Sequence, residues 1–89
     1  MRIIYRTNTF EKDFVRMAKR GKSPVKLKRL VEQLVNDEPL PSSRRDHPLS
    51  GDYTGTRECH IEPDWLLIYE IDPEELRLIR TGTHSDLFG

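Results

Sequence analysis

The side chains with the most chemical potential lie in one short segment and near the C-terminus. The segment His60–Trp65, read HIEPDW, holds a histidine, two carboxylates and the only tryptophan of the chain. Because Pro63 interrupts it, we expect a turn between two strands. Arg80 and His84 follow later, and a folded sheet could bring them against this turn.

Three histidines, His47, His60 and His84, are candidates for proton transfer, because histidine changes charge nearest neutral pH. Three unrelated surface histidines would explain the sequence equally simply. A metal site formed by these histidines and Asp64 is a further alternative, although their spacing matches no compact metal-binding motif.

Arg80 is expected at the end of a strand, where its side chain can leave the sheet. A guanidinium there suits a phosphate, since its fork donates two parallel hydrogen bonds. A salt bridge with Glu58 or Asp64 is the structural alternative. Trp65 is either a core residue or, beside the turn, a stacking face for a base.

These residue types fit cleavage of an RNA phosphodiester without a metal. A base would remove the proton of the 2′-hydroxyl, an acid would protonate the leaving 5′-oxygen, and a cation would stabilise the phosphate. The sequence contains no glycine-rich phosphate loop and no signature of a serine or cysteine nucleophile. The residues permit this reaction without singling it out.

The length of 89 residues predicts one domain. No apolar run is long enough for a membrane span and no signal peptide is evident, so we expect a cytoplasmic protein. The single Cys59 excludes an internal disulfide and a multi-cysteine zinc site.

The net charge of zero conceals a division between the two halves of the chain. Residues 1–45 contain 12 basic and 5 acidic residues, a balance of +7, and residues 46–89 contain 3 and 10, a balance of −7. This asymmetry favours a polyanion or an oppositely charged protein as partner, although solvated helix faces would explain it as well.

The elements that must position the site begin with a strand at Arg2–Arg6 and two amphipathic helices. The first is expected to start at a capping box formed by Asn8 and Glu11 and to end at Gly21. The second begins with Ser23 as cap and Pro24 as first helical residue. Together they predict an antiparallel helical hairpin.

After a loop over residues 39–53, three strands are expected at Thr56–Ile61, Trp65–Ile71 and Leu76–Thr81, followed by a tail. Alternation puts Glu58 and His60 on one face of the sheet. The fold class is therefore α+β, in the order β-α-α-β-β-β, with a mostly antiparallel sheet and both helices on one face.

Three sequence blocks resemble the YafQ branch of the RelE-type bacterial toxins. They are DHPLSG at Asp46–Gly51, HIEPDWLLIY at His60–Tyr69 and RTGTHSDLFG at Arg80–Gly89, and their order and spacing match. The resemblance covers residues 1–89 as a single RelE-like domain. It implies the toxin of a type II toxin–antitoxin pair, an endoribonuclease that cuts translated mRNA in the ribosomal A site without metal or cofactor.

The resemblance also implies a catalytic set: His47, His60, Asp64, Arg80 and His84. Within it, His84 would be the general acid, Asp64 or His47 the base, and Arg80 the group that steadies the phosphate. Relatives often have an aspartate where this chain has Glu58, whose role is left open. The resemblance implies that Trp65 and Phe88 contact the RNA. The basic candidates for RNA binding are Lys19, Arg20, Lys22, Lys26, Arg44 and Arg45.

The implied partners are a small, usually acidic antitoxin, mRNA with ribosomal RNA, and operator DNA only through the antitoxin; no membrane is implied. The main alternative is a ParE-like toxin on the same scaffold that blocks a protein such as gyrase, because fold alone does not decide activity. A regulator without catalytic activity is a second alternative.

Overall fold

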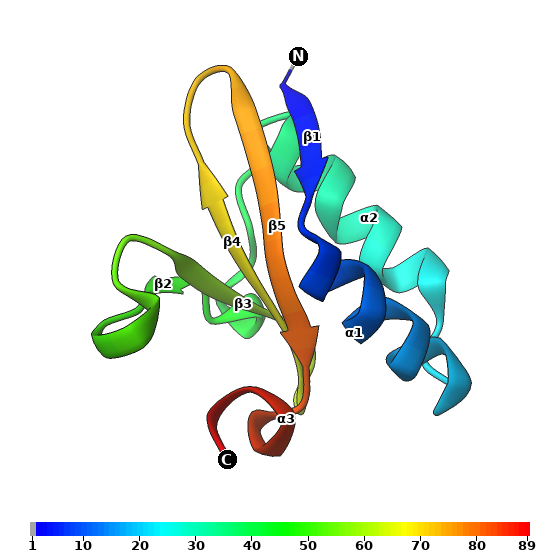
Figure 1. Cartoon of the computed structure of the whole chain (residues 1–89). Helices are drawn as coiled ribbons and strands as arrows, with labels where there is room; N and C mark the ends of the chain where they lie inside the picture. The colour runs from blue at the N-terminus through cyan, green and yellow to red at the C-terminus, as the bar shows by residue number, and fades with distance from the viewer. Residues whose placement is uncertain (1) are drawn as a thin grey trace.

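In the computed structural model, which describes residues 2–89, one five-stranded sheet separates two long helices from a short C-terminal helix (Figure 1). The strand order is β1-β5-β4-β3-β2. Strand β1 (Ile3–Arg6) runs parallel to β5 (Glu75–Gly82). The pairs formed by β5, β4 (Trp65–Ile71), β3 (Arg57–Glu62) and β2 (His47–Pro48) are antiparallel. The predicted α+β class with a mostly antiparallel sheet is confirmed.

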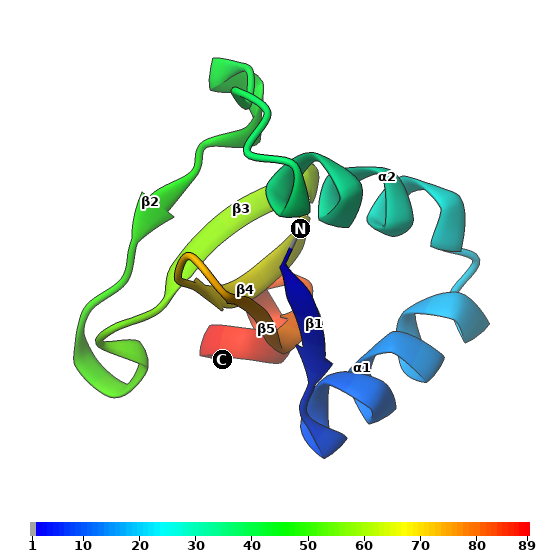
Figure 2. The same cartoon turned by 90° about the horizontal axis from the view of Figure 1, so that it is seen from above.

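Helices α1 (Asn8–Lys19) and α2 (Pro24–Val35) lie on the same side of the sheet, as predicted, and their axes diverge when seen from above (Figure 2). The predicted cap at Asn8 is wrong by one residue. Thr7 is the N-cap, since its Oγ1 accepts a hydrogen bond from the Phe10 N–H at 2.9 Å and donates one to the Ile79 carbonyl at 2.8 Å. Pro24 begins α2 after Ser23, as predicted.

The main hydrophobic core lies between the helices and the sheet. The helical apolar stripes meet one face of the strands, and burial of such side chains contributes about 1.5–3 kcal/mol each. The buried members are Phe10, Met17, Leu27, Leu30, Val31, Leu34 and Val35 from the helices and Cys59, Ile61, Trp65, Leu67, Tyr69, Leu76 and Leu78 from the strands.

The opposite face of the sheet is covered by a short helix, where the sequence predicts only a tail. Helix α3 (His84–Phe88) packs Leu87 against Leu66 and Ile68. It begins with a capping box in which the Thr83 side chain and the Asp86 carboxylate each accept a backbone hydrogen bond. A helix of five residues is too short to show a helical repeat of apolar residues in the sequence. Only the capping-box spacing of Thr83 and Asp86 could have indicated it.

The predicted loop over residues 39–53 also contains more structure than expected: two 3-10 turns, η1 (Ser42–Arg44) and η2 (Gly51–Tyr53), and the short strand β2. No helix within residues 2–89 is both long and apolar enough to cross a membrane.

Candidate active site

Four residues form a continuous row of cross-strand neighbours over the sheet. His47 pairs with Glu58, Glu58 with Ile68, and Ile68 with Arg80. Because neighbouring strands lie about 4.8 Å apart, the backbones of Glu58 and Arg80 are separated by roughly 10 Å. The register of the sheet therefore places Glu58 and Arg80 on the same face of the sheet, two strands apart.

A bulge in β5 sets the direction of Arg80. Ile68 pairs with Arg80 while the next residue, Tyr69, pairs with Leu78, so Ile79 is an extra residue in β5. Ile79 packs against the apolar cluster beneath α3, whereas Leu78 belongs to the core under the helices. Such a bulge re-aims the side chains that follow it.

Glu58 is a buried carboxylate between two histidines. It is only 4% exposed, and its Oε1 lies 3.4 Å from Nε2 of His47 and 3.4 Å from Nε2 of His60. His60 is mostly buried and His47 half exposed. The predicted common face of Glu58 and His60 is confirmed. Sequence reasoning left the role of Glu58 open, although its alternation with His60 was a signal.

His84, the first residue of α3, is fixed by Asp64 in the turn between β3 and β4. The Asp64 Oδ1 accepts from the His84 backbone N–H at 2.9 Å and from Nδ1 at 2.5 Å. These two hydrogen bonds lower the pKa of Asp64, because both stabilise the charged carboxylate. The His84 ring meets the His60 ring edge-on, with centroids 5.7 Å apart. The structure thus brings His47, Glu58, His60, Asp64 and His84 into one cluster.

Three members of this cluster have a spacing that could hold a metal ion. The donor atoms of Glu58, His60 and His84 all lie within 4.8 Å of one another. Imidazole nitrogens and a carboxylate suit zinc or copper. This set differs from the predicted alternative, which used His47 and Asp64 in place of Glu58.

Arg80 forms a salt bridge with neither Glu58 nor Asp64, so that prediction is wrong. Its guanidinium instead faces Asp13 on α1, with Nε–Oδ2 at 2.8 Å and Nη2–Oδ1 at 3.0 Å. On its other side Nη1 lies 3.4 Å from the Tyr53 hydroxyl. The Asp13 hydrogen bonds raise the pKa of Arg80, which remains charged.

Trp65 does not offer a stacking face, so its prediction as an RNA-binding residue is wrong. It is 1% exposed, and its indole Nε1–H donates to the Thr81 hydroxyl at 2.9 Å. As the first residue of β4 on the helix side, its large ring fills the core. Phe88 is 48% exposed and meets the Tyr53 ring edge-on at 5.9 Å. Tyr53 thus joins Phe88 and Arg80 at a surface position that sequence reasoning missed.

Most of the predicted basic RNA-binding residues have partners within the chain. Lys22 and Lys26 each lie 2.8 Å from a carboxylate oxygen of Glu62. Arg20 holds Asp86 through two contacts, at 2.6 and 3.2 Å. Within residues 2–89, Lys19 has no ion pair and is exposed to solvent. These contacts neutralise much of the basic surface of the two helices.

A cavity of about 630 Å³ lies beside the histidine cluster. Arg44 forms part of its wall and donates from Nη1 to the carbonyls of His60 and Ile61, at 3.2 and 3.1 Å. Arg45 is exposed and has no ion pair within residues 2–89. The cavity is lined by Ser43, Arg44, Arg45, His60, Ile61, Glu62, Pro63 and His84, and it has the size and positive charge to hold a nucleotide.

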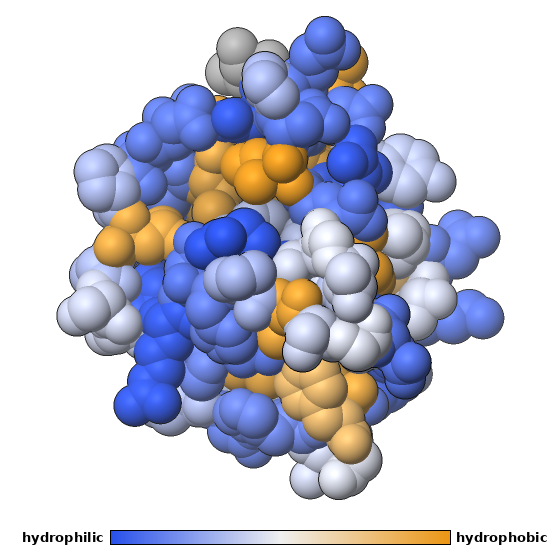
Figure 3. Space-filling view, turned by 90° about the vertical axis from the view of Figure 1, so that its left-hand side faces the viewer, coloured by the Kyte–Doolittle hydropathy of each residue, from blue (hydrophilic) through white to orange (hydrophobic). Residues whose placement is uncertain are grey.

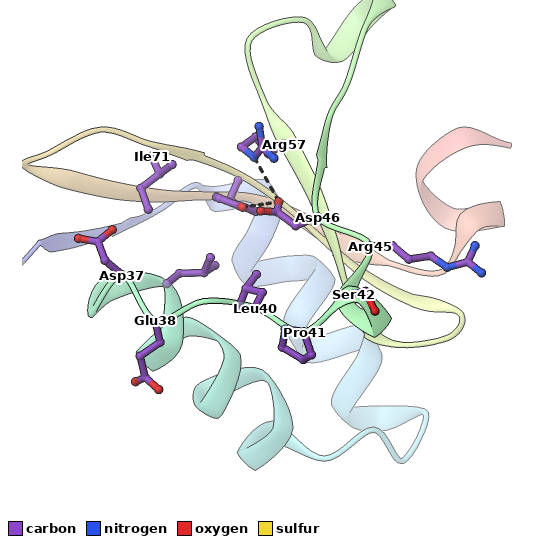
Figure 4. Close-up of a pocket in the computed structure, with 11 residues that line it drawn as sticks. Asp37, Glu38, Leu40, Pro41, Ser42, Arg45, Asp46, Arg57 and Ile71 are labelled. Atoms are coloured by element: carbon purple, nitrogen blue, oxygen red, sulfur yellow. Dashed lines mark hydrogen bonds and ion pairs between the residues drawn. The ribbon is translucent and has the colours of Figure 1, made fainter.

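Asp46 fixes the segment that carries His47. Its Oδ1 accepts from the Tyr69 hydroxyl at 2.6 Å and from Arg57 Nε at 3.2 Å, in a second pocket of about 580 Å³. Figure 4 shows these contacts and shows Arg45 pointing away from the pocket.

The surface on the β2 side of the sheet is mostly hydrophilic (Figure 3). A polar partner would therefore fit this face better than an apolar one.

Known proteins with a similar sequence and fold identify the family. The family model for YafQ, a bacterial toxin of type II toxin–antitoxin systems, matches residues 2–89. The chain is 48% identical to the mRNA interferase toxin YafQ of Escherichia coli strain K12 over 81 residues, 90% of this chain and 88% of that protein.

Two solved structures extend this similarity to the fold. The structure of the DinJ–YafQ complex of E. coli matches with a TM-score of 0.91 and 46% identity over all of both chains. A metal-bound toxin from Helicobacter pylori matches with a TM-score of 0.90 and 39% identity, over 99% of this chain and 100% of that one.

Proposed function

Because the chain belongs to the YafQ family of bacterial type II toxins, we propose that it is an mRNA interferase that cuts translated mRNA in the ribosomal A site. The observation that best supports this proposal is the Asp64–His84 pair beside the buried Glu58. An oriented histidine next to a second acid–base group is what phosphodiester cleavage through the 2′-hydroxyl requires.

His84 acts as the general acid. Asp64 accepts the Nδ1 hydrogen bond, which leaves Nε2 as the ring nitrogen that faces the substrate. From Nε2 the ring delivers a proton to the 5′-oxygen as the P–O5′ bond breaks. A second hydrogen bond from the His84 backbone to the same carboxylate prevents the ring from turning away.

Glu58 acts as the general base, in place of the earlier candidates Asp64 and His47. Asp64 is occupied by His84, and His47 is the most exposed member of the pair that flanks Glu58. Glu58 takes the proton of the 2′-hydroxyl, whose oxygen then attacks the adjacent phosphorus. The products are a 2′,3′-cyclic phosphate and a 5′-hydroxyl, and no step requires a metal ion.

Arg80 stabilises the negative charge that develops on the phosphate. His47 and His60 hold the Glu58 carboxylate from both sides and, when protonated, add positive charge near the same phosphate. Electrostatic stabilisation of the developing charge by fixed groups is the largest single contribution to the rate enhancement of many enzymes.

The RNA strand lies over the catalytic cluster, between two surface sites. On one side the cavity with Arg44 and Arg45 receives a nucleotide. On the other side Phe88 and Tyr53 supply an aromatic surface for a base. Exposed Lys19 and the paired cations of the helices contact ribosomal RNA in this proposal.

The partner in the resting cell is a small acidic antitoxin. This is supported by solved structures of the E. coli DinJ–YafQ toxin–antitoxin complex, in which a relative is bound to its antitoxin. Binding to operator DNA is indirect, through the antitoxin, and the protein acts in the cytoplasm, where its mRNA substrate is translated. The gyrase-type alternative has less support, because the curated relatives are named mRNA interferases.

The test is mRNA cleavage in a translating extract by the wild type and by His84→Gln, each with and without EDTA. We expect cuts that persist in EDTA and a rate constant lowered about 10²- to 10⁴-fold in the variant. Ser85→Ala, on the next residue of α3, is the matched control and retains activity. An inactive but folded wild type would refute the nuclease assignment.

A further inference from the structure

Asp13 is a charged residue in the interior that the proposed mechanism does not use. It lies on α1, is 1% exposed, and is 67 residues from its partner Arg80 in the chain. A carboxylate is buried in a protein only at a considerable cost in solvation, so its contacts must compensate.

Both oxygens of the Asp13 carboxylate accept hydrogen bonds. Oδ2 accepts from Arg80 Nε at 2.8 Å and from the Thr81 backbone N–H at 3.2 Å. Oδ1 accepts from Arg80 Nη2 at 3.0 Å, and Arg16 Nη2 lies 3.5 Å away. The carboxylate thus holds both the side chain and the backbone at the end of β5.

This arrangement uses the Nε–Nη2 edge of the guanidinium and, within residues 2–89, leaves the outer Nη1–Nη2 edge without a carboxylate partner. The Nε and Nη2 edge is occupied by Asp13, while Nη1 faces the Tyr53 hydroxyl at 3.4 Å. The Arg80 side chain is 23% exposed, so part of it reaches solvent. The parallel N–H groups of Nη1 and Nη2 on the outer edge can bind two phosphate oxygens.

We propose that Asp13 is a positioning residue, which acts through Arg80 and aims its outer guanidinium edge at the scissile phosphate. A buried ion pair contributes little net stability compared with apolar packing, so stability alone does not account for this one. A precise orientation of the Arg80 cation contributes more to the cleavage rate than to stability, because electrostatic stabilisation of the transition state depends on a fixed geometry. The expected effect on the cleavage rate rests on the proposed nuclease function. The contact between Arg80 and a phosphate does not depend on it.

The kinetic test uses single-turnover cleavage of ribosome-bound mRNA at saturating complex. Asp13→Asn keeps the size of the side chain and loses its charge, and we expect a rate constant about 10- to 100-fold lower. In an Arg80→Ala background, Asp13→Asn has no further effect. Asp72→Asn, in the β4–β5 turn, is a matched carboxylate control and cleaves normally. A further loss in the Arg80→Ala background would overturn the proposal.

A second readout does not depend on cleavage. In NMR spectra of the wild type we expect separate, slowly exchanging signals for the Arg80 Nη groups, which move when inorganic phosphate is added. In Asp13→Asn these signals average and no longer respond to phosphate. Averaged signals in the wild type, or an equal response in both proteins, would refute the positioning role even if the variant is unstable or the nuclease assignment fails.

Discussion

Asp64 binds both the backbone and the imidazole of His84, through N–H at 2.9 Å and Nδ1 at 2.5 Å to the same oxygen. The two residues come from different elements, a β-turn and the start of a five-residue helix. Because α3 is short, this contact and the Thr83–Asp86 capping box determine where His84 lies.

Asp64→Asn is therefore expected to lower cleavage without unfolding the protein. The amide still accepts from the His84 backbone, but the hydrogen bond that fixes the imidazole loses its charged acceptor. We expect a cleavage rate constant about 10- to 100-fold lower at neutral pH. An unchanged rate constant would separate Asp64 from catalysis.

Glu58→Gln tests the assignment of the base. The amide fills the same space between His47 and His60 but accepts no proton at neutral pH. We expect the cleavage rate constant to fall about 10²- to 10⁴-fold. Glu70→Gln, on β4 and outside the lining of the cavity beside the histidine cluster, is the control. Retained activity in Glu58→Gln would return the role of base to His47.

Trp65 and Phe88 were both predicted to bind RNA, and the structure separates them. Trp65→Phe leaves a void and removes the hydrogen bond to Thr81, so we expect it to lower the free energy of unfolding by about 1–3 kcal/mol. Phe88→Ala exposes little new surface and should instead raise the concentration of ribosome complex needed for half-maximal cleavage. Denaturant unfolding and cleavage titrations of both variants distinguish these effects.

The Arg20–Asp86 contact predicts a dependence of stability on acid. Hydrogen bonds from Arg20 and Thr83 hold the pKa of Asp86 well below its ordinary value near 4. A depressed pKa stabilises the fold above the unfolded value, and this contribution is lost as the pH falls through the folded value. Wild type should thus exceed Asp86→Asn in melting temperature at pH 7, with a difference that narrows steadily as the pH falls below about 4. A constant difference would contradict the linkage.

The elements with strong periodicity were predictable and the short ones were not. The apolar stripe of α2 and the run of β4 determine their own structure, because many residues repeat the same signal. The β5 bulge at Ile79 and the Asp13–Arg80 pair leave no local pattern, since each depends on contacts between distant segments. The roles of the candidate site residues were predicted from the family resemblance and not from their spacing.

The cluster of Glu58, His60 and His84 predicts inhibition by a transition metal ion. Its donor atoms lie within 4.8 Å of one another, and Zn²⁺ prefers such nitrogen and oxygen ligands. A bound ion would occupy both the base and the acid, so added Zn²⁺ should stop cleavage, and EDTA should restore it. His60→Gln should weaken Zn²⁺ binding in calorimetry about 10-fold or more, whereas His47→Gln, which removes none of the three ligand side chains, should weaken it much less. Equal binding by both variants would place the ion elsewhere, and unchanged cleavage at saturating Zn²⁺ would show that Glu58 and His84 are not the base and the acid.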